Sequence, residues 1–245
     1  MENTDNQPVN VFIPCCMDLY NPEIAEKFMR LIWKLGLQIH YNPQQTCCGR
    51  QFYFSGQKEV AEEFGIKFTK LLKLNFPVLF PTTACPAYIK HYFPKMFHNT
   101  HTHHEVKILI NQVFEISDFI VNKLGKKCLG NKYNNRVYYF KSCQARNLYG
   151  LGDEPETLLR NTEGLDLIVR PENDLCCTGN NDFYLHNPQM SDELLKRLIE
   201  DAYNSGAQVI TTTDIHCLQH ITSYLNTLDV QLTPLHVVEI YASGL

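Results

Sequence analysis

The sequence predicts an α/β protein made of two pseudo-symmetric halves, each a small parallel sheet flanked by helices. Three observations support this fold class. A pattern of cysteines occurs twice, short apolar runs lie shortly upstream of single cysteines, and amphipathic helical patterns lie between these runs. Strands that alternate with helices are typical of parallel sheets. We therefore expect two units of one topology, over residues 8–125 and 135–243.

The cysteine pattern is the most specific of these observations. Two adjacent pairs stand at 47–48 and 176–177, and 31 and 32 residues separate them from a single cysteine upstream. Another single cysteine follows each pair, 37 and 40 positions on. Eight of the ten cysteines thus form two sets in the same order: Cys15, Cys47, Cys48 and Cys85, then Cys143, Cys176, Cys177 and Cys217. This matching order predicts an internal repeat.

Four short runs are rich in apolar, β-branched or aromatic residues, and they predict the strands. They cover residues 11–13, 77–82, 137–140 and 208–213. Continuous apolar runs of this length are typical of strands buried on both faces, as in a parallel sheet. Each run ends close to a single cysteine of the repeat, so we expect the cysteines where strands end and helices begin.

Helical patterns fill the intervals between the strands. The clearest begins at Asn21 and Pro22, an N-cap followed by a proline at the first helical position, and ends at Gly36. Similar apolar stripes predict helices over 58–74, 154–160 and 189–204, and a helix over 108–124 that closes the first half. Residues 126–135, rich in Lys, Asn and Gly, predict the linker between the halves.

Charge and hydropathy narrow the classes of function. The chain has 245 residues and a net charge of −4, which argues against nucleic acid as the main partner. Residues 1–10 are polar and acidic, unlike a signal or transit peptide, and no apolar run approaches the 18 or so residues of a membrane span. We expect a soluble cytoplasmic protein with no membrane span.

Cysteines in that compartment point to metal or redox chemistry rather than to a disulfide framework. Four thiolates per half suit a soft, tetrahedral metal, either zinc or the irons of a cluster. The spacing lacks the paired C-x2-C knuckles of a zinc ribbon. Adjacent cysteines reach different irons of a cluster more easily than one small ion, so the pattern favours iron and sulfur, with zinc left open.

Several residues near the repeat have roles that the cysteine pattern does not assign. Cys16 neighbours a proposed ligand but should point away from it, and Cys128 lies in the linker. His220 follows Cys217 by three positions, where it could ligate a metal or donate a hydrogen bond. Thr178 follows the second cysteine pair, where Gly49 follows the first, so we expect a second site that is distorted, differently loaded or empty.

The sequence around these cysteines is similar to a known family. The segments FIPC (12–15) and TCCGRQ (46–51), with SDFI (117–120) and KSC (141–143), resemble the CCG cysteine-rich proteins. That family includes the cysteine-rich component of heterodisulfide reductase, the iron–sulfur component of glycolate oxidase and the lactate-utilisation branch, to which the resemblance is greatest. The family motif often ends in C-x-x-C. Here Tyr88 and His220 stand in place of the last cysteine, which argues against a fifth thiolate.

The resemblance implies both a cofactor and a role. It implies one or two iron–sulfur clusters per chain, of the 4Fe–4S type, held by the eight cysteines of the repeat. It also implies a non-catalytic electron-transfer subunit in an oxidoreductase complex that oxidises L-lactate or a similar 2-hydroxy acid. A ferredoxin-like iron–sulfur subunit and a further subunit would be its partners.

Two other functions remain open from the sequence. The chain could be a catalytic subunit, one that reduces a disulfide or oxidises a hydroxy acid at an open cluster position. A pocket with convergent polar groups beside the cluster would favour that role. It could also be a zinc-stabilised scaffold, which would be colourless where an iron–sulfur protein is brown.

Overall fold

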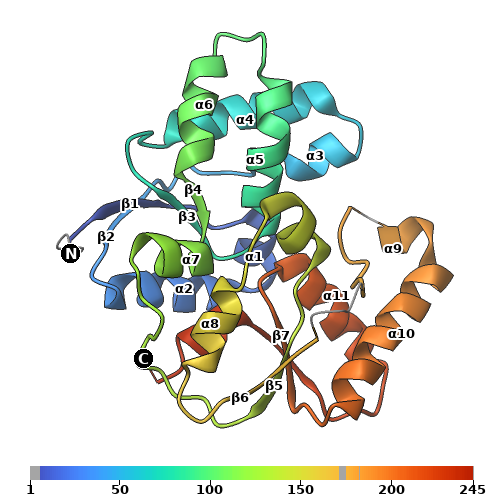
Figure 1. Ribbon diagram of the computed structural model, residues 1–245. Coiled ribbons are helices and arrows are strands. Elements are labelled where there is room, and N and C mark those ends of the chain that lie inside the picture. Colours follow the sequence, from blue (N-terminus) through green and yellow to red (C-terminus); the bar gives the residue numbers. More distant parts are fainter. Residues whose placement is uncertain (1–5, 171–174, 182, 245) are drawn as a thin grey trace.

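Two four-stranded parallel sheets form the framework of the protein (Figure 1). The computed structural model describes residues 6–170, 175–181 and 183–244. The strand order is β2-β1-β3-β4 in one sheet and β6-β5-β7-β8 in the other. All neighbouring strands within each sheet run parallel. The shared order confirms the predicted fold class of two pseudo-symmetric halves.

The helices and strands follow one another in a similar order in the two halves. The first half contains β1 (Pro8–Val11), α1 (Cys15–Tyr20), α2 (Pro22–Lys34), β2 (Gln38–Tyr41), α3 (Arg50–Phe54), α4 (Lys58–Leu71), β3 (Val78–Phe80), α5 (Ala84–Met96), α6 (His103–Gln112), β4 (Val113–Glu115), α7 (Ile116–Asp118) and the π-helix η1 (Phe119–Lys123). The second contains β5 (Arg136–Tyr139), the π-helix η2 (Gln144–Tyr149), α8 (Glu154–Arg160), β6 (Asp166–Val169), α9 (Phe183–His186), α10 (Pro188–Asn204), β7 (Val209–Thr212), α11 (Ile215–Leu225), β8 (Thr233–His236) and α12 (Val237–Tyr241).

A shared hydrophobic core joins the two halves. Helices α2, α7, α8 and α12 lie between the two sheets (Figure 1). Their buried side chains belong to one cluster, which includes Phe28, Leu31, Ile116, Leu158 and Tyr241. The outer faces are covered separately, by α4, α5 and α6 on the first sheet and by α10 and α11 on the second. Because the middle layer belongs to both halves, their sheets are held in a fixed relation.

Hydrogen bonds from backbone N–H groups also cross between the halves beside the sheet edges. The Thr83 N–H donates to the Thr213 carbonyl oxygen at 3.0 Å, and the Ile215 N–H donates to Thr82 Oγ1 at 3.0 Å. These residues follow β3 and β7, the strands that lead to Cys85 and Cys217. The carboxyl edges of the two sheets therefore face one another, and the two cysteine sets approach a common interface.

The predicted helix over 108–124 is wrong. Strand β4 interrupts it, and all three of its residues are buried beside β3. Apolar residues recur along the whole of 108–124, and periodicity alone does not distinguish a short buried strand among them from a helix. The fourth strand of the other sheet, β8, was not predicted because its Pro234 is unusual in a strand. Helices α2, α4, α8 and α10 match their predicted positions closely.

Within the described part of the chain, no helix combines the length and the apolarity needed to cross a membrane.

A buried carboxyl group caps helix α7 in the middle layer. Glu115 is fully buried, and its Oε2 accepts hydrogen bonds from the backbone N–H groups of Ser117 and Asp118, at 2.8 and 3.2 Å. Burial raises the pKa of Glu115 from 4.5 to about 8 despite these bonds. The folded protein therefore binds one proton more than the unfolded chain between these two pH values.

This proton makes stability depend on pH. Glu115 stabilises the fold fully below about pH 4.5, and the contribution is lost as the pH rises through about 8. Relative to Glu115→Gln, the wild type should lose about 1 kcal/mol of unfolding free energy per pH unit between about pH 5 and about pH 8. Chemical denaturation of both metal-free proteins across this range measures the difference. Parallel pH profiles would show that Glu115 is already ionised in the folded state.

Candidate metal centre

Four cysteines of the first half gather at the carboxyl edge of its sheet. Cys15 begins α1 shortly after β1, and Cys85 lies in the first turn of α5 after β3. Cys47 and Cys48 directly precede α3 and its N-cap residue Gly49. The carboxyl ends of parallel strands share one edge of the sheet, where α/β proteins bind their ligands. Residues far apart in sequence therefore meet here, as the cysteine pattern predicts.

The four sulfur atoms form a continuous chain. Cys15 Sγ lies 3.6 Å from Cys47 Sγ, and Cys48 Sγ lies 3.4 Å from Cys85 Sγ. Cys47 and Cys48 are adjacent in the sequence, so the two pairs belong to one group. Cys48 and Cys85 are buried whereas Cys15 is exposed. The group therefore extends from the protein interior to the surface.

Cys47 is the thiol of this group whose pKa is lowered. Hydrogen bonds from Cys15, Cys48 and the Gly49 N–H lower the pKa of Cys47 to about 3, with a further contribution from the Arg50 charge. The pKa values of Cys15 and Cys48 are raised, because hydrogen bonding to Cys47 and burial favour their neutral forms. One negative charge is thus stabilised by thiols, an amide N–H and a guanidinium, which is suitable for an anionic sulfur ligand.

Gly49 gives the loop its shape. Its φ of 88° lies in the left-handed region, and a Cβ there would lie 2.8 Å from the Ala61 carbonyl oxygen in α4. Its N–H donates to Cys47 Sγ at 3.3 Å. A glycine is therefore required both by the backbone conformation and by the close packing against α4.

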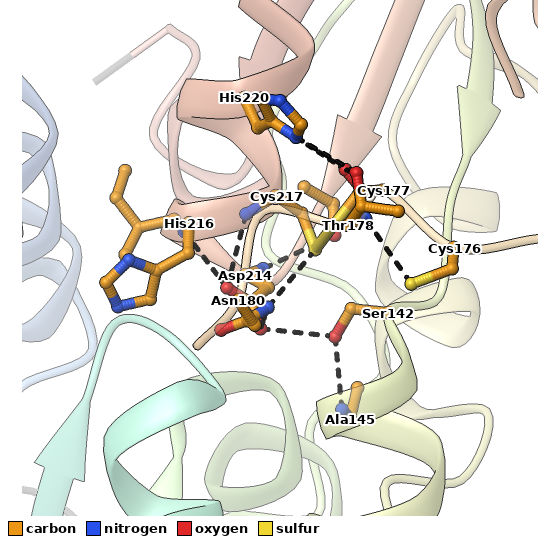
Figure 2. The surroundings of a disulfide bond; sticks show 12 residues. Ser142, Ala145, Cys176, Cys177, Thr178, Asn180, Asp214, His216, Cys217 and His220 are labelled. Carbon is orange, nitrogen blue, oxygen red and sulfur yellow. Dashed lines mark hydrogen bonds between the residues drawn. A yellow bond between two sulfur atoms is a disulfide. The ribbon is translucent and has the colours of Figure 1, made fainter. Parts of the chain in front are cut away.

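The second half repeats this arrangement with one difference. Cys143 is the N-cap residue of η2 and hydrogen-bonds to Cys176, whose pKa falls to about 6, mainly because of that bond. The Thr178 N–H donates to Cys176 Sγ at 3.3 Å, as Gly49 does to Cys47. Cys177 and Cys217 are joined by a disulfide (Figure 2). They correspond to Cys48 and Cys85 in the first half.

Thr178 adopts the left-handed backbone that glycine has in the first half. Its φ is 56°, which is rare for a β-branched residue. Its hydroxyl group donates to the Cys177 carbonyl oxygen at 2.8 Å and also contacts Ser191 and His220. Side-chain hydrogen bonds of Thr178 therefore hold the loop after Cys177 in this conformation. In the loop after Cys48, Gly49 adopts the same conformation without strain.

The two sets differ in how well they fit an iron–sulfur cluster. The first offers four contiguous sulfur donors, two of them buried, which suits a soft metal cluster. In the second, the disulfide engages Cys177 and Cys217, so four thiolates become available there only after its reduction. Among the described residues, no three or more His, Cys, Asp or Glu side chains are arranged to hold a metal ion. The fit of a cluster thus rests on the donor chemistry of the first set.

The other sequence candidates lie beside these groups. Cys16 Sγ is 3.8 Å from His216 Nε2 and outside the chain of four sulfurs. Cys128 is exposed and donates to the Asn161 carbonyl oxygen. The His220 Nδ1–H donates to the Cys177 carbonyl oxygen at 2.7 Å, so this nitrogen supports the loop (Figure 2).

Polar residues between the two sets had no predicted role. Arg50, the residue after Gly49, donates from Nη2 to Asn180 Oδ1 at 2.8 Å and to Asn181 Oδ1 at 2.6 Å. Asn180 in turn donates to Asp214, the N-cap of α11 (Figure 2). A cation two positions after a ligand pair was a usable sequence signal. Its partners lie 130 residues away and could not be identified without the fold.

Two segments of the chain, residues 9–86 and 137–222, each match the family model described as a cysteine-rich domain, CCG. The chain belongs to the CCG cysteine-rich domain family. The two matched segments contain the two cysteine sets, so each half corresponds to one copy of the CCG domain. This confirms the family resemblance of the sequence.

Curated CCG-type relatives align with nearly the whole chain. Lactate utilization protein A 2 of Bacillus cereus strain Q1 is 28% identical, over 97% of this chain and 98% of its own length. Lactate utilization protein A of Oceanobacillus iheyensis is 28% identical over 95% of both chains. Among solved structures, a putative Asp/Glu racemase from Yersinia pestis is 13% identical to this chain. The match covers 97% of this chain and 96% of the racemase, with a TM-score of 0.38.

The fit of Gly49 leads to a paired prediction. Gly49→Ala should destabilise the fold by about 2–3 kcal/mol, because the new methyl group adds a backbone clash to the left-handed strain. Gly56→Ala is the matched control: its φ is 85°, but a Cβ there meets nothing within 4 Å, so only about 1 kcal/mol should be lost. Thermal denaturation measures both, and equal losses would contradict the close packing against α4.

Proposed function

We propose that this protein is an iron–sulfur electron-transfer subunit of a complex that oxidises L-lactate or a similar 2-hydroxy acid. The observation that carries the proposal is the chain of four sulfur atoms at the edge of the first sheet. The names of the full-length relatives support the choice of lactate, and family membership supports iron and sulfur as the metal chemistry.

Each half is proposed as one domain, residues 8–125 and 135–243, with one cluster site. The first 4Fe–4S cluster would be held by Cys15, Cys47, Cys48 and Cys85, and a second, after reduction of the disulfide, by Cys143, Cys176, Cys177 and Cys217. Such clusters, when bound, accept and release single electrons. The Gly49 N–H, the Arg50 guanidinium and the burial of Cys48 would tune the potential, since hydrogen bonds, charge and solvent exposure set it.

The placement of the first site suits electron exchange with another protein. Cys15 is exposed while Cys48 and Cys85 are buried, so one side of the site reaches the surface. Redox partners dock through small, weak contacts. We propose a ferredoxin-like iron–sulfur subunit and a further subunit as partners, in line with a lactate-utilisation complex.

A second candidate function is that of a cluster-based catalytic subunit. The observation that favours it is a cavity between the halves, lined by polar residues that include Arg50, His216 and Gln219. Such a cavity would hold a hydroxy acid, or a disulfide to be reduced, beside the cysteine sets. Whether the isolated chain turns over substrate separates this role from that of a carrier.

The carrier role predicts that the isolated chain will not oxidise L-lactate. Purified without oxygen and loaded with iron and sulfide, it should be reduced by dithionite and reoxidised by an artificial acceptor. It should show no lactate-dependent reduction of that acceptor, because lactate gives up a hydride, a two-electron transfer, whereas an iron–sulfur cluster accepts single electrons. Visible absorption follows both reactions. Sustained lactate turnover by the isolated chain would replace the carrier role with the catalytic one.

A further inference from the structure

The cavity between the halves is lined by residues that neighbour both cysteine sets in the sequence. Its volume is about 340 Å³, within the range of small-molecule sites. Its lining includes Arg50 from the first half and, from the second, Asn181, His216, Gln219, His220 and Ser223. Neither half could form it alone.

Three lining residues lie close to cysteines. His216 precedes Cys217, and its Nε2 lies 3.8 Å from Cys16 Sγ. His220 donates to the Cys177 carbonyl oxygen at 2.7 Å. Arg50 is separated from Cys48 only by Gly49. A molecule bound in the cavity would therefore lie near the loops that carry both cysteine sets.

Arg50 gives the cavity its positive charge. The side chain is only 4% exposed, and its Nη2 donates to the neutral amide oxygens of Asn180 and Asn181. Its Nη1 lies 3.5 Å from His216 Nε2. These partners bring no negative charge.

Arg50 forms no direct ion pair with a carboxylate among the described residues, although its charge acts on the Cys47 thiol. Its Nε is buried without a hydrogen-bond partner among the described residues. The carboxylate connected to it, Asp214, is reached through the side-chain amide of Asn180, which donates to Asp214 Oδ2 at 3.4 Å. Because the Nε–H group is unpaired and the described hydrogen-bond acceptors of the guanidinium are neutral, a carboxylate would bind favourably here.

The remaining described lining residues favour a small carboxylate. Gln219 and Ser223 offer amide and hydroxyl groups suited to a hydroxyl or keto oxygen, and no described lining residue is acidic. Arginine is the side chain best suited to bind carboxylates through charge-assisted hydrogen bonds. We infer that this cavity binds the carboxylate of a 2-hydroxy or 2-oxo acid, with Arg50 as its anchor. The choice of acid rests on the proposed function.

Calorimetric titration of the iron-loaded chain without oxygen tests this inference. The probes are L-lactate, pyruvate, the uncharged analogue lactamide, and inorganic phosphate. L-lactate or pyruvate should bind, and lactamide should bind at least about tenfold more weakly because it lacks the charge. Arg50→Gln should weaken carboxylate binding by at least about tenfold, for the same reason.

Two further variants separate binding from folding. Ser223 is exposed and outside both cysteine sets, so Ser223→Tyr should fill the cavity, preserve the iron content and reduce binding. Arg30→Gln is the matched control, because Arg30 lies on α2 in an exposed pair with Glu26 and should leave binding unchanged.

The outcomes distinguish this inference from the proposed function. Failure of the iron-loaded wild type to bind either acid would overturn the inference and leave the carrier role. Unchanged binding in Ser223→Tyr, or phosphate binding as tight as that of the acids, would also overturn it. Carboxylate binding by a chain that retains no iron would support the inference and overturn the proposed function.

Discussion

The convergence of strand ends at one sheet edge is the constraint on which this structure depends. Cys15 and Cys85 are far apart in sequence, yet each follows a strand of one parallel sheet, and β1 pairs directly with β3. The Cys47–Cys48 pair enters from the loop after β2, which pairs with β1 on its other side. Parallel strands end at the same edge of the sheet. The fold therefore brings together four thiols that are too far apart in the sequence to belong to one local motif.

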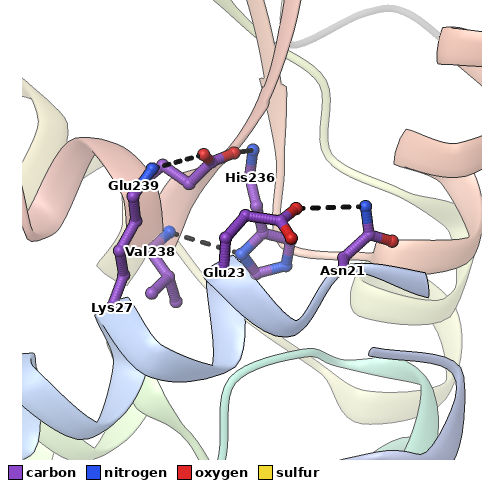
Figure 3. Close-up of polar contacts among 6 residues, drawn as sticks. All are labelled: Asn21, Glu23, Lys27, His236, Val238 and Glu239. Atoms are coloured by element: carbon purple, nitrogen blue, oxygen red, sulfur yellow. Dashed lines mark hydrogen bonds and ion pairs between the residues drawn. The ribbon is translucent and has the colours of Figure 1, made fainter. Parts of the chain in front are cut away.

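The repeat then places two such edges opposite one another. The shared middle layer and the hydrogen bonds between the segments after β3 and β7 fix their relation. The polar residues at the interface form one network from Arg50 through Asn180 to Asp214. The N-cap of α12 is the buried His236, which accepts from the Val238 N–H, and Glu239 binds both the His236 N–H and Lys27 of α2 (Figure 3). Polar contacts therefore join the halves on both sides of the core.

The sequence predicted those features that depend on local patterns. The order of the cysteines identified the repeat, and Pro22 at the start of α2 and Gly36 after it marked helix boundaries. Strand β4 was missed because its pairing with β3, a tertiary contact, determines its conformation. The disulfide and the cavity also lay beyond prediction, since both depend on how loops from distant segments approach one another.

The central claim is that the first cysteine set holds iron and sulfide. Its most direct test is to quantify iron, zinc and acid-labile sulfide after reconstitution without oxygen, with electron paramagnetic resonance, in wild type, Cys48→Ser and Cys128→Ser. The account predicts brown wild-type protein with iron and sulfide, loss of both or an altered spectrum in Cys48→Ser, and no change in Cys128→Ser, whose thiol is exposed in the linker. Equal iron content in all three proteins, or zinc without sulfide in the wild type, would contradict it.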